Sequence, residues 1–370
     1  MGLDIRAKVF LESAQRRRKG AKAIAMAKYE PLSTLDRTFL DIEYPETHMH
    51  VGGVAIFDAH PLRMSTGGID IARIREFVAS RLHLIPRYRQ RIARTPLRNN
   101  PIWIDDQRFN LDYHVRHTAL PQPGDEEQLK RLAGRILSQQ LDRGKPLWEF
   151  WIVEGLEGDR FAAISKTHHC MIDGIAAVDL VSLLLSPTRE VASSDPPPWK
   201  PEPTPSNREL VLGEAARRLA RPFTFCRAVR DAVRDPAGAV FDLTENIFAV
   251  TETLRAGLSP ASDSPFNQPI GPHRRFEWTV FDLSEVKHVK SRLGGTVNDV
   301  VLATVAGAVG SFLRNRGFPP QELAELDFRA LVPVSIRDPS QRGTLGNRIA
   351  SWAAKLPISC PSSIITASIP

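Results

Sequence analysis

The segment from Phe161 to Leu185 constrains the fold more than any other part of the chain. Its first seven residues form an alternating run that predicts a strand. Residues 168–174 then read His-His-Cys-Met-Ile-Asp-Gly, and the apolar stretch 175–185 predicts a helix. A strand, a turn and a helix in this order place two adjacent histidines at the end of a strand, which holds side chains rigidly.

The two histidines are candidates for acid–base chemistry, because imidazole takes up a proton near neutral pH. Neighbouring strand residues point to opposite faces, so His168 and His169 are expected to have different roles, one ring facing a cavity and the other packed or hydrogen-bonded. Asp173 is expected to hold the turn, through its own backbone or through a buried arginine. Gly174 permits a backbone angle that other residues avoid.

Other interpretations of this motif remain open. A histidine is often an ordinary core or surface residue with its hydrogen bonds satisfied. A metal site is not expected, because His168 and His169 splay apart and no third His or Cys lies at zinc spacing. Cys170 is interpreted as a buried structural thiol in preference to a catalytic one.

The motif resembles that of CoA-dependent acyltransferases with the chloramphenicol-acetyltransferase-like fold, which include peptide-synthetase condensation domains. Further blocks are similar to the bacterial wax ester synthase/diacylglycerol acyltransferase family, in that family's order, and cover roughly Tyr29 to Pro357. These blocks are Pro31-Leu32-Ser33 with Asp36 and Phe39, Met49-His50-Val51-Gly52-Gly53, Leu141-Asp142-Arg143, Pro146-Leu147-Trp148-Glu149, Asn298-Asp299-Val300-Val301-Leu302-Ala303, Val332-Pro333-Val334-Ser335-Ile336-Arg337 and Leu345-Gly346-Asn347-Arg348.

The resemblance implies an α/β fold with mixed sheets in two domains, and transfer of a long-chain acyl group from acyl-CoA to diacylglycerol or a long-chain alcohol. It assigns His169 as the general base and His168 as a supporting residue, with acyl-CoA as co-substrate, no other cofactor and no metal. It further implies that Asp173, Gly174 and Arg337 have structural roles at the site, with a buried bridge between Asp173 and Arg337.

Asn298 and Asp299 are interpreted in two ways. The resemblance places them near the substrate tunnel. The sequence also explains them as the start of a helix that runs to about Asn315, with Thr296 and Asp299 as a capping pair.

Composition and pattern predict four segments. Residues 1–28 form a basic arm, 29–185 an N-terminal acyltransferase domain, 186–272 a proline-rich and helical linker, and 273–370 a partial C-terminal domain. The final residues lack the charged amphipathic helix that the family pattern requires, so a truncated chain with an incomplete second domain is expected. Two alternatives stay open: a non-catalytic remnant that binds lipid or membrane, and a related acyltransferase or condensation enzyme with another acceptor, such as an amine.

The charge distribution bears on partners and location. The net charge is +7, and residues 1–28 contribute six of these charges through eight basic and two acidic residues. The remaining chain is nearly neutral, which disfavours a nucleic-acid binder. The arm is interpreted as a solvated tail or a peripheral membrane contact. Three cysteines fit a reducing cytoplasm, and no apolar run is expected to span a membrane. The expected location is the cytoplasm, with peripheral contact at the inner face of the plasma membrane or at lipid bodies.

Periodicity also predicts individual elements. The expected strands are Met49–Phe57, Phe109–His117, Trp148–Glu154 and Arg275–Phe281, and the expected helices are Asp70–Leu82, Glu126–Gln140 and one capped by Ser284 that stops at Gly294. The turn at residues 157–159 predicts a hairpin between the strand that precedes it and the motif strand.

Overall fold

The computed structural model describes residues 29–171, 197–216, 262, 264–335 and 349–360. These residues fall into two compact units. The first holds the described part of 1–227 together with 270–277, and the second holds the described parts of 228–269, 278–338 and 348–370. Each unit is a mixture of helices and strands, as the sequence predicts.

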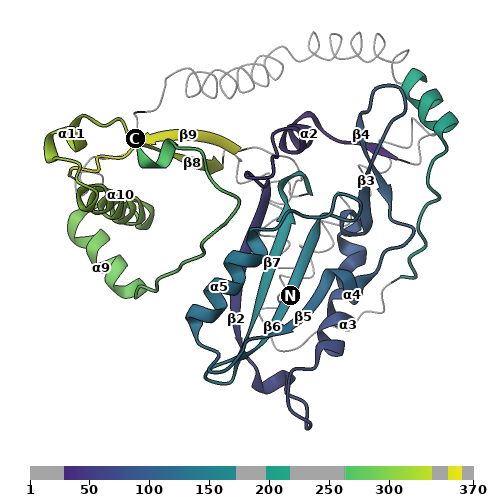
Figure 1. The fold of residues 1–370 in the computed structure, drawn as a ribbon, viewed down its shortest axis with the longest axis horizontal. Coiled ribbons are helices and arrows are strands. Elements are labelled where there is room, and N and C mark those ends of the chain that lie inside the picture. The colour runs from purple at the N-terminus through teal and green to yellow at the C-terminus, as the bar shows by residue number, and fades with distance from the viewer. Residues whose placement is uncertain (1–28, 172–196, 217–261, 263, 336–348, 361–370) are drawn as a thin grey trace. The chain divides into compact units, whose positions relative to one another are not determined.

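A four-stranded mixed sheet forms the centre of the first unit (Figure 1). Its strands are β2 (His50–Asp58), β5 (Val115–Ala119), β6 (Trp148–Leu156) and β7 (Arg160–His168), in the order β2-β7-β6-β5. β7 pairs antiparallel with both of its neighbours, and only β5 and β6 run parallel. The predicted hairpin between β6 and β7 is confirmed. The motif strand is therefore an inner strand, hydrogen-bonded on both sides.

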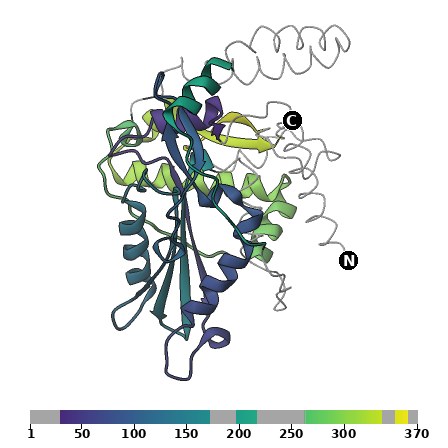
Figure 2. The ribbon, with the colours of Figure 1, turned by 90° about the vertical axis from the view of Figure 1, so that its right-hand side faces the viewer.

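Helices cover both faces of this sheet (Figures 1 and 2). On one face, α3 (Ile71–Arg81) contributes to the main apolar core, which also includes Phe161 and Ala163 of β7. On the other face lies α5 (Glu126–Leu137), whose Leu137 side chain contacts Gly52 of β2. Because side chains alternate along a strand, His168 lies on the same face of β7 as Lys166, the α5 face.

The rest of the first unit supports this sheet. A smaller antiparallel sheet has the order β1-β4-β3, formed by β1 (Glu30–Pro31), β3 (Gln90–Arg94) and β4 (Pro101–Asp105). Helix α2 (Thr34–Asp41) follows β1, and its N-terminus is capped by Ser33, which accepts a hydrogen bond from the Asp36 N–H. Phe39 of α2 stacks on the ring of His169, in the histidine turn formed by residues 168–171.

The second unit is built around α10 (Val297–Asn315), with α9 (Leu283–Leu293), α11 (Pro320–Glu325) and an antiparallel pair of strands, β8 (Arg329–Ser335) and β9 (Ile349–Lys355). The predicted α10 is confirmed, including its capping box: the Thr296 hydroxyl accepts from the Asp299 N–H, and the Asp299 carboxylate accepts from the Thr296 N–H. One side of α10, including Val300, Ala306 and Leu313, packs in the core of this unit.

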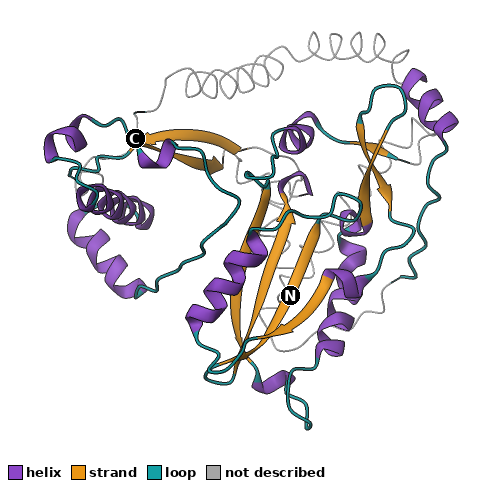
Figure 3. Cartoon of the chain, in the orientation of Figure 1, coloured by secondary structure: helices purple, strands orange, loops and turns teal. Residues whose placement is uncertain are grey.

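Three predicted elements differ from the structure. The expected strand Phe109–His117 is a short helix, α4 (Leu111–His114), followed by β5, because Asn110 accepts a hydrogen bond from the Asp112 N–H and opens a helical turn. The expected strand Arg275–Phe281 is loop (Figure 3). There the Arg274 N–H donates to the Ser138 hydroxyl at the end of α5, so this part of the chain bonds to a helix and pairs with no described strand.

Finally, the cap of α9 is Asp282 and not Ser284, because the Asp282 carboxylate accepts the Ser284 N–H at 2.7 Å.

One described helix has the length and apolar composition of a membrane span, contrary to the expectation from the sequence. This helix is α10, and 28% of its apolar stretch is buried. The core helix of a folded domain has the same composition, and α10 contributes buried side chains to such a core.

Candidate active site

The histidine turn is held by hydrogen bonds from its own backbone to both neighbouring strands. The His168 N–H donates to the Leu147 carbonyl at 3.0 Å, and the His169 N–H donates to the Met49 carbonyl at 2.8 Å. Leu147 and Met49 are the residues directly before β6 and β2. His169 begins a 3₁₀ turn, His169–Met171, immediately after β7. The position of both histidines is thus set by the central sheet.

The His168 ring is packed inside the unit, with a side-chain exposure of 1%. Its Nδ1 accepts a hydrogen bond from the Cys170 N–H at 3.1 Å. An imidazole nitrogen that accepts a hydrogen bond carries no proton, so the proton of this ring is on Nε2. That Nε2 lies 3.6 Å from Oε2 of Glu43. His168 therefore faces a buried carboxylate and leaves no nitrogen free for a substrate.

The His169 ring is half-buried and stacks on Phe39, with ring centroids 4.4 Å apart. Burial lowers the pKa of His169, the electrostatic effect of the neighbouring His168 lowers it further, and a hydrogen bond to the His169 backbone opposes both. The lowered pKa keeps the ring neutral at pH 7, so one of its two nitrogens carries a lone pair. A neutral imidazole can act as a general base at neutral pH.

Glu43, just after α2, accepts hydrogen bonds from the residue before β2 and from the segment after α5. Its side chain is 1% exposed. Arg143 donates to Oε2 from Nε at 3.1 Å and from Nη2 at 2.7 Å, Gln140 donates to the same oxygen at 3.0 Å, and the Met49 N–H donates to Oε1 at 3.2 Å. Burial raises the pKa of this carboxyl, but His168, Arg143 and Gln140 outweigh burial and hold the pKa well below its usual range. Glu43 is therefore an anion next to His168.

Cys170 is buried, as the sequence predicts for a structural thiol. Burial is the main reason that the pKa of its thiol lies well above the ordinary value. A protonated thiol is a poor nucleophile, so the structure gives Cys170 no catalytic part.

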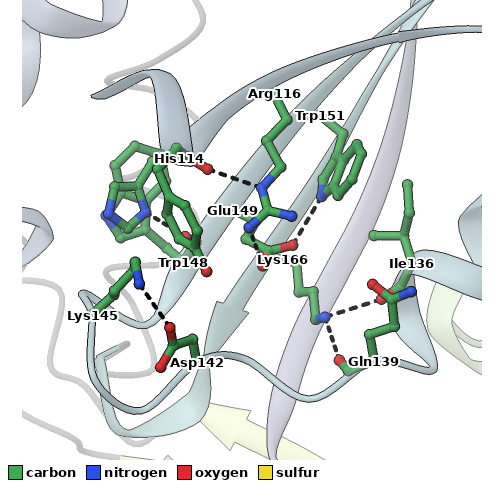
Figure 4. Close-up of polar contacts among 11 residues, drawn as sticks. His114, Arg116, Ile136, Gln139, Asp142, Lys145, Trp148, Glu149, Trp151 and Lys166 are labelled. Atoms are coloured by element: carbon green, nitrogen blue, oxygen red, sulfur yellow. Dashed lines mark hydrogen bonds and ion pairs between the residues drawn. The ribbon is translucent and has the colours of Figure 1, made fainter. Parts of the chain in front are cut away.

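Three basic side chains bind the carbonyl oxygens at the end of α5, close in sequence to Gln140 and Arg143. His50 Nε2 bonds to the Leu137 carbonyl at 3.0 Å, and His48 Nε2 bonds to the Ser138 carbonyl at 2.9 Å. Lys166, which is fully buried, donates to the carbonyls of Ile136, at 3.0 Å, and Gln139 (Figure 4). The last carbonyls of a helix have no partners within the helix, so these bonds fasten α5 to β2 and β7.

The sequence did not single out Lys166, His48 or Glu43. His50 is paired with His168 in the register of β2 and β7, and the two strands are more than 100 residues apart along the chain. The block Met49-His50-Val51-Gly52-Gly53 was the only signal for His50, and His48, which precedes β2, had none. A lysine within a strand gives no sequence signal that it is buried.

The pH dependence of stability follows from His50. Burial, and then the charge of Lys166, lower its pKa from 6.5 to about 4. Between about pH 6.5 and pH 4, His50 is protonated in the unfolded chain but stays neutral in the folded chain. The contribution of neutral His50 is therefore complete above pH 6.5 and is lost as the pH falls toward 4. We expect a loss on the order of 1–2 kcal/mol after solvent screening.

Denaturant unfolding at several pH values between 7.5 and about 4.5 measures this loss. His50→Gln keeps a donor for the Leu137 carbonyl but cannot titrate, so its stability should change less over this range. An equal slope for His50→Gln and wild type would contradict the assignment to His50.

Of the five other predicted site residues, the structure describes only Asn298 and Asp299. Asp173, Gly174 and Arg337 lie outside the described residues, and so does the predicted bridge between Asp173 and Arg337. Asn298 and Asp299 lie in the second unit at the start of α10, where Asn298 is exposed and Asp299 caps the helix. Within the described ranges, no three His, Cys, Asp or Glu side chains lie close enough together to hold a metal ion.

Residues 32–301 match the family model of the wax ester synthase/diacylglycerol acyltransferase catalytic domain. The chain belongs to this family. The match extends from just before α2 into α10 and contains the histidine turn and Glu43. The resemblance drawn from the sequence motifs is confirmed.

Relatives in Mycobacterium tuberculosis (strain H37Rv) carry the name diacylglycerol O-acyltransferase. Rv3087 is 34% identical over 323 residues, which are 85% of this chain and 65% of that protein. Tgs3 is 34% identical over 265 residues, which are 70% of this chain and 95% of that protein. The chain thus spans just under two thirds of the length of Rv3087 and nearly all of Tgs3.

The fold is also similar to a solved structure of this family. The wax ester synthase/diacylglycerol acyltransferase from Marinobacter aquaeolei VT8 superposes with a TM-score of 0.58 and 24% identity, over 91% of this chain and 70% of that one. This similarity confirms the predicted fold class, a mixed α/β fold with mixed sheets.

Proposed function

We propose that this chain is an acyl-CoA-dependent O-acyltransferase that transfers a long-chain acyl group to the hydroxyl of diacylglycerol or of a long-chain alcohol. The observation that carries the proposal is the state of His169. At the end of β7, its backbone N–H is bonded to the Met49 carbonyl, and its half-buried ring stacks on Phe39. Burial lowers the pKa of the ring, so the ring is neutral at pH 7 and can accept a proton. Family membership supports the reaction class.

The ring of His169 would carry the proton from the acceptor to the leaving group. An alcohol is almost fully protonated at pH 7, so the ring removes its proton as the oxygen attacks the thioester carbonyl carbon. The carbon–sulfur bond then breaks, and the protonated ring returns the proton to the departing CoA thiolate. The products are the ester and free CoA, and His169 is neutral again. This reaction requires neither a covalent acyl-enzyme nor a metal.

The proposed partners are acyl-CoA and a water-insoluble acceptor. An enzyme for such acceptors works at a lipid surface, so the proposed location is the cytoplasm, with peripheral contact at the inner face of the plasma membrane or at lipid bodies.

The test measures thiol release from palmitoyl-CoA by the purified protein with no acceptor, with diacylglycerol, with hexadecanol or with hexadecylamine. We expect release that depends on one of the two hydroxyl acceptors, with the ester identified by mass spectrometry. Preference for the amine would contradict a hydroxyl acceptor and favour a condensation-type reaction. Binding of acyl-CoA or lipid without turnover by folded protein would contradict an enzyme and favour a lipid-binding role.

A further inference from the structure

We propose that Glu43 is a positioning residue for the histidine turn, and that its buried carboxylate acts through His168 to hold His169 ready for proton transfer. This inference rests on the proposed function. Glu43 touches neither His169 nor any substrate in the contacts described above, so its effect passes through His168 and the backbone.

The Glu43 carboxylate binds two segments that lie around the turn, one on each oxygen. Oxygen Oε1 accepts from the Met49 N–H, and the Met49 carbonyl in turn accepts from the His169 N–H at 2.8 Å. Oxygen Oε2 accepts from Arg143 and Gln140, which follow α5. The carboxylate therefore fixes Met49, the residue before β2 whose carbonyl accepts the His169 N–H.

The orientation of the His168 ring also depends on Glu43. Its Nδ1 accepts from the Cys170 N–H, so its Nε2–H points toward Glu43 Oε2 at 3.6 Å. This distance is longer than that of a full hydrogen bond, so the contact between the N–H dipole and the carboxylate is electrostatic. Nε2 is buried and has no other partner within the described structure. Glu43 is thus the only described group that stabilises this proton. It thereby fixes the orientation of the His168 ring, whose Nδ1 accepts the Cys170 N–H.

A buried negative charge at Glu43 also suits the reaction proposed for His169. His169 becomes positive when it takes the acceptor proton, directly beside His168 in the chain. In a buried site, a fixed anion that needs no rearrangement stabilises positive charge that develops nearby. Arg143, which balances the charge of Glu43, is 38% exposed, so solvent screens the cation more than the anion.

The deciding variant is Glu43→Gln, because glutamine keeps the shape and an acceptor oxygen but removes the charge. We expect kcat to fall roughly 10- to 100-fold, the loss found when a carboxylate that orients a metal-bound imidazole is removed. KM for acyl-CoA and acceptor should stay near the wild-type values. Glu76→Gln, the same chemical change at an exposed site on α3, should behave as wild type. A wild-type kcat for Glu43→Gln would overturn the proposal.

A spectroscopic signature separates positioning from a general loss of folded protein. Proton NMR of the wild type should show the buried Nε2 proton of His168, protected from exchange with solvent and shifted downfield by the nearby carboxylate. The signal should disappear in His168→Gln and move upfield in Glu43→Gln. A downfield signal that persists in His168→Gln, or no such signal in the wild type, would overturn the pairing even if Glu43→Gln does not fold. If the wild type lacks turnover, the proposed function fails, and the NMR measurement still tests the pairing.

Discussion

Replacing His169 with alanine should lower kcat by about two to four orders of magnitude, the usual contribution of a general base. KM for acyl-CoA and acceptor should change little, because the ring accepts a proton in the transition state and contributes little to binding of the substrates. The fold should tolerate the change, since the half-buried ring stacks on Phe39 and the backbone bond to Met49 is kept. The measurement is acceptor-dependent thiol release at saturating substrate, beside the thermal unfolding midpoint.

His60→Ala is the matched control, because His60 is exposed in a 3₁₀ turn after β2 and belongs to no part of the site. It should retain wild-type turnover. If His169→Ala keeps more than about half of the wild-type kcat while remaining folded, another group is the base and the mechanism proposed above is wrong.

Replacing Gly310 with alanine should destabilise the second unit by about 2 kcal/mol. In the interior of an exposed helix this change stabilises by roughly 0.5–1 kcal/mol, because glycine loses more conformational freedom on folding. Here α10 packs directly on the residues after β9, and an added Cβ would overlap the carbonyl oxygen of Ile358. Backbone cannot yield as a flexible side chain does, so overpacking dominates and costs about 1–3 kcal/mol.

Hydrogen exchange followed by mass spectrometry measures this effect within the second unit, because α10 and α11 yield their own peptides. Faster exchange in these peptides, with unchanged exchange in β7, is the expected result. Gly271→Ala is the control, since a Cβ at Gly271 would meet nothing within 4 Å. Slower exchange in α10 of Gly310→Ala would show that the contact with Ile358 does not constrain the helix.

The elements that the sequence predicts well are those whose signals are local. The start of α10 is encoded within four residues by Thr296 and Asp299, and the apolar stripe that follows is long. The β7 strand and its hairpin with β6 are adjacent in the chain. The helix α4 was missed because Asn110 caps a single turn inside a segment of strand-like composition. The cap of α9 was misplaced because Asp282 and Ser284 are both good capping residues two positions apart.

The site shows the same division. His168 and His169 are found from the motif, because they are adjacent and follow a strand. The partners that fix them come from distant segments, and only the pairing of β2 and β6 with β7 brings Met49 and Leu147 to the turn. Glu43 follows α2 in a segment without any motif of its own. Its importance follows from its burial and its contacts, which no local pattern of residues encodes.

The backbone bonds of His168 and His169 to Leu147 and Met49 also limit how this site can evolve. They make the proposed base an extension of an inner strand, whereas many enzymes carry such a residue on a loop that tolerates insertions and drift. A shift of His169 would require β7 to move against β2 and β6, to which it is hydrogen-bonded. We therefore expect new acceptors to be accommodated by changes in the residues around a stationary imidazole, and laboratory selection for altered substrates should begin at those residues.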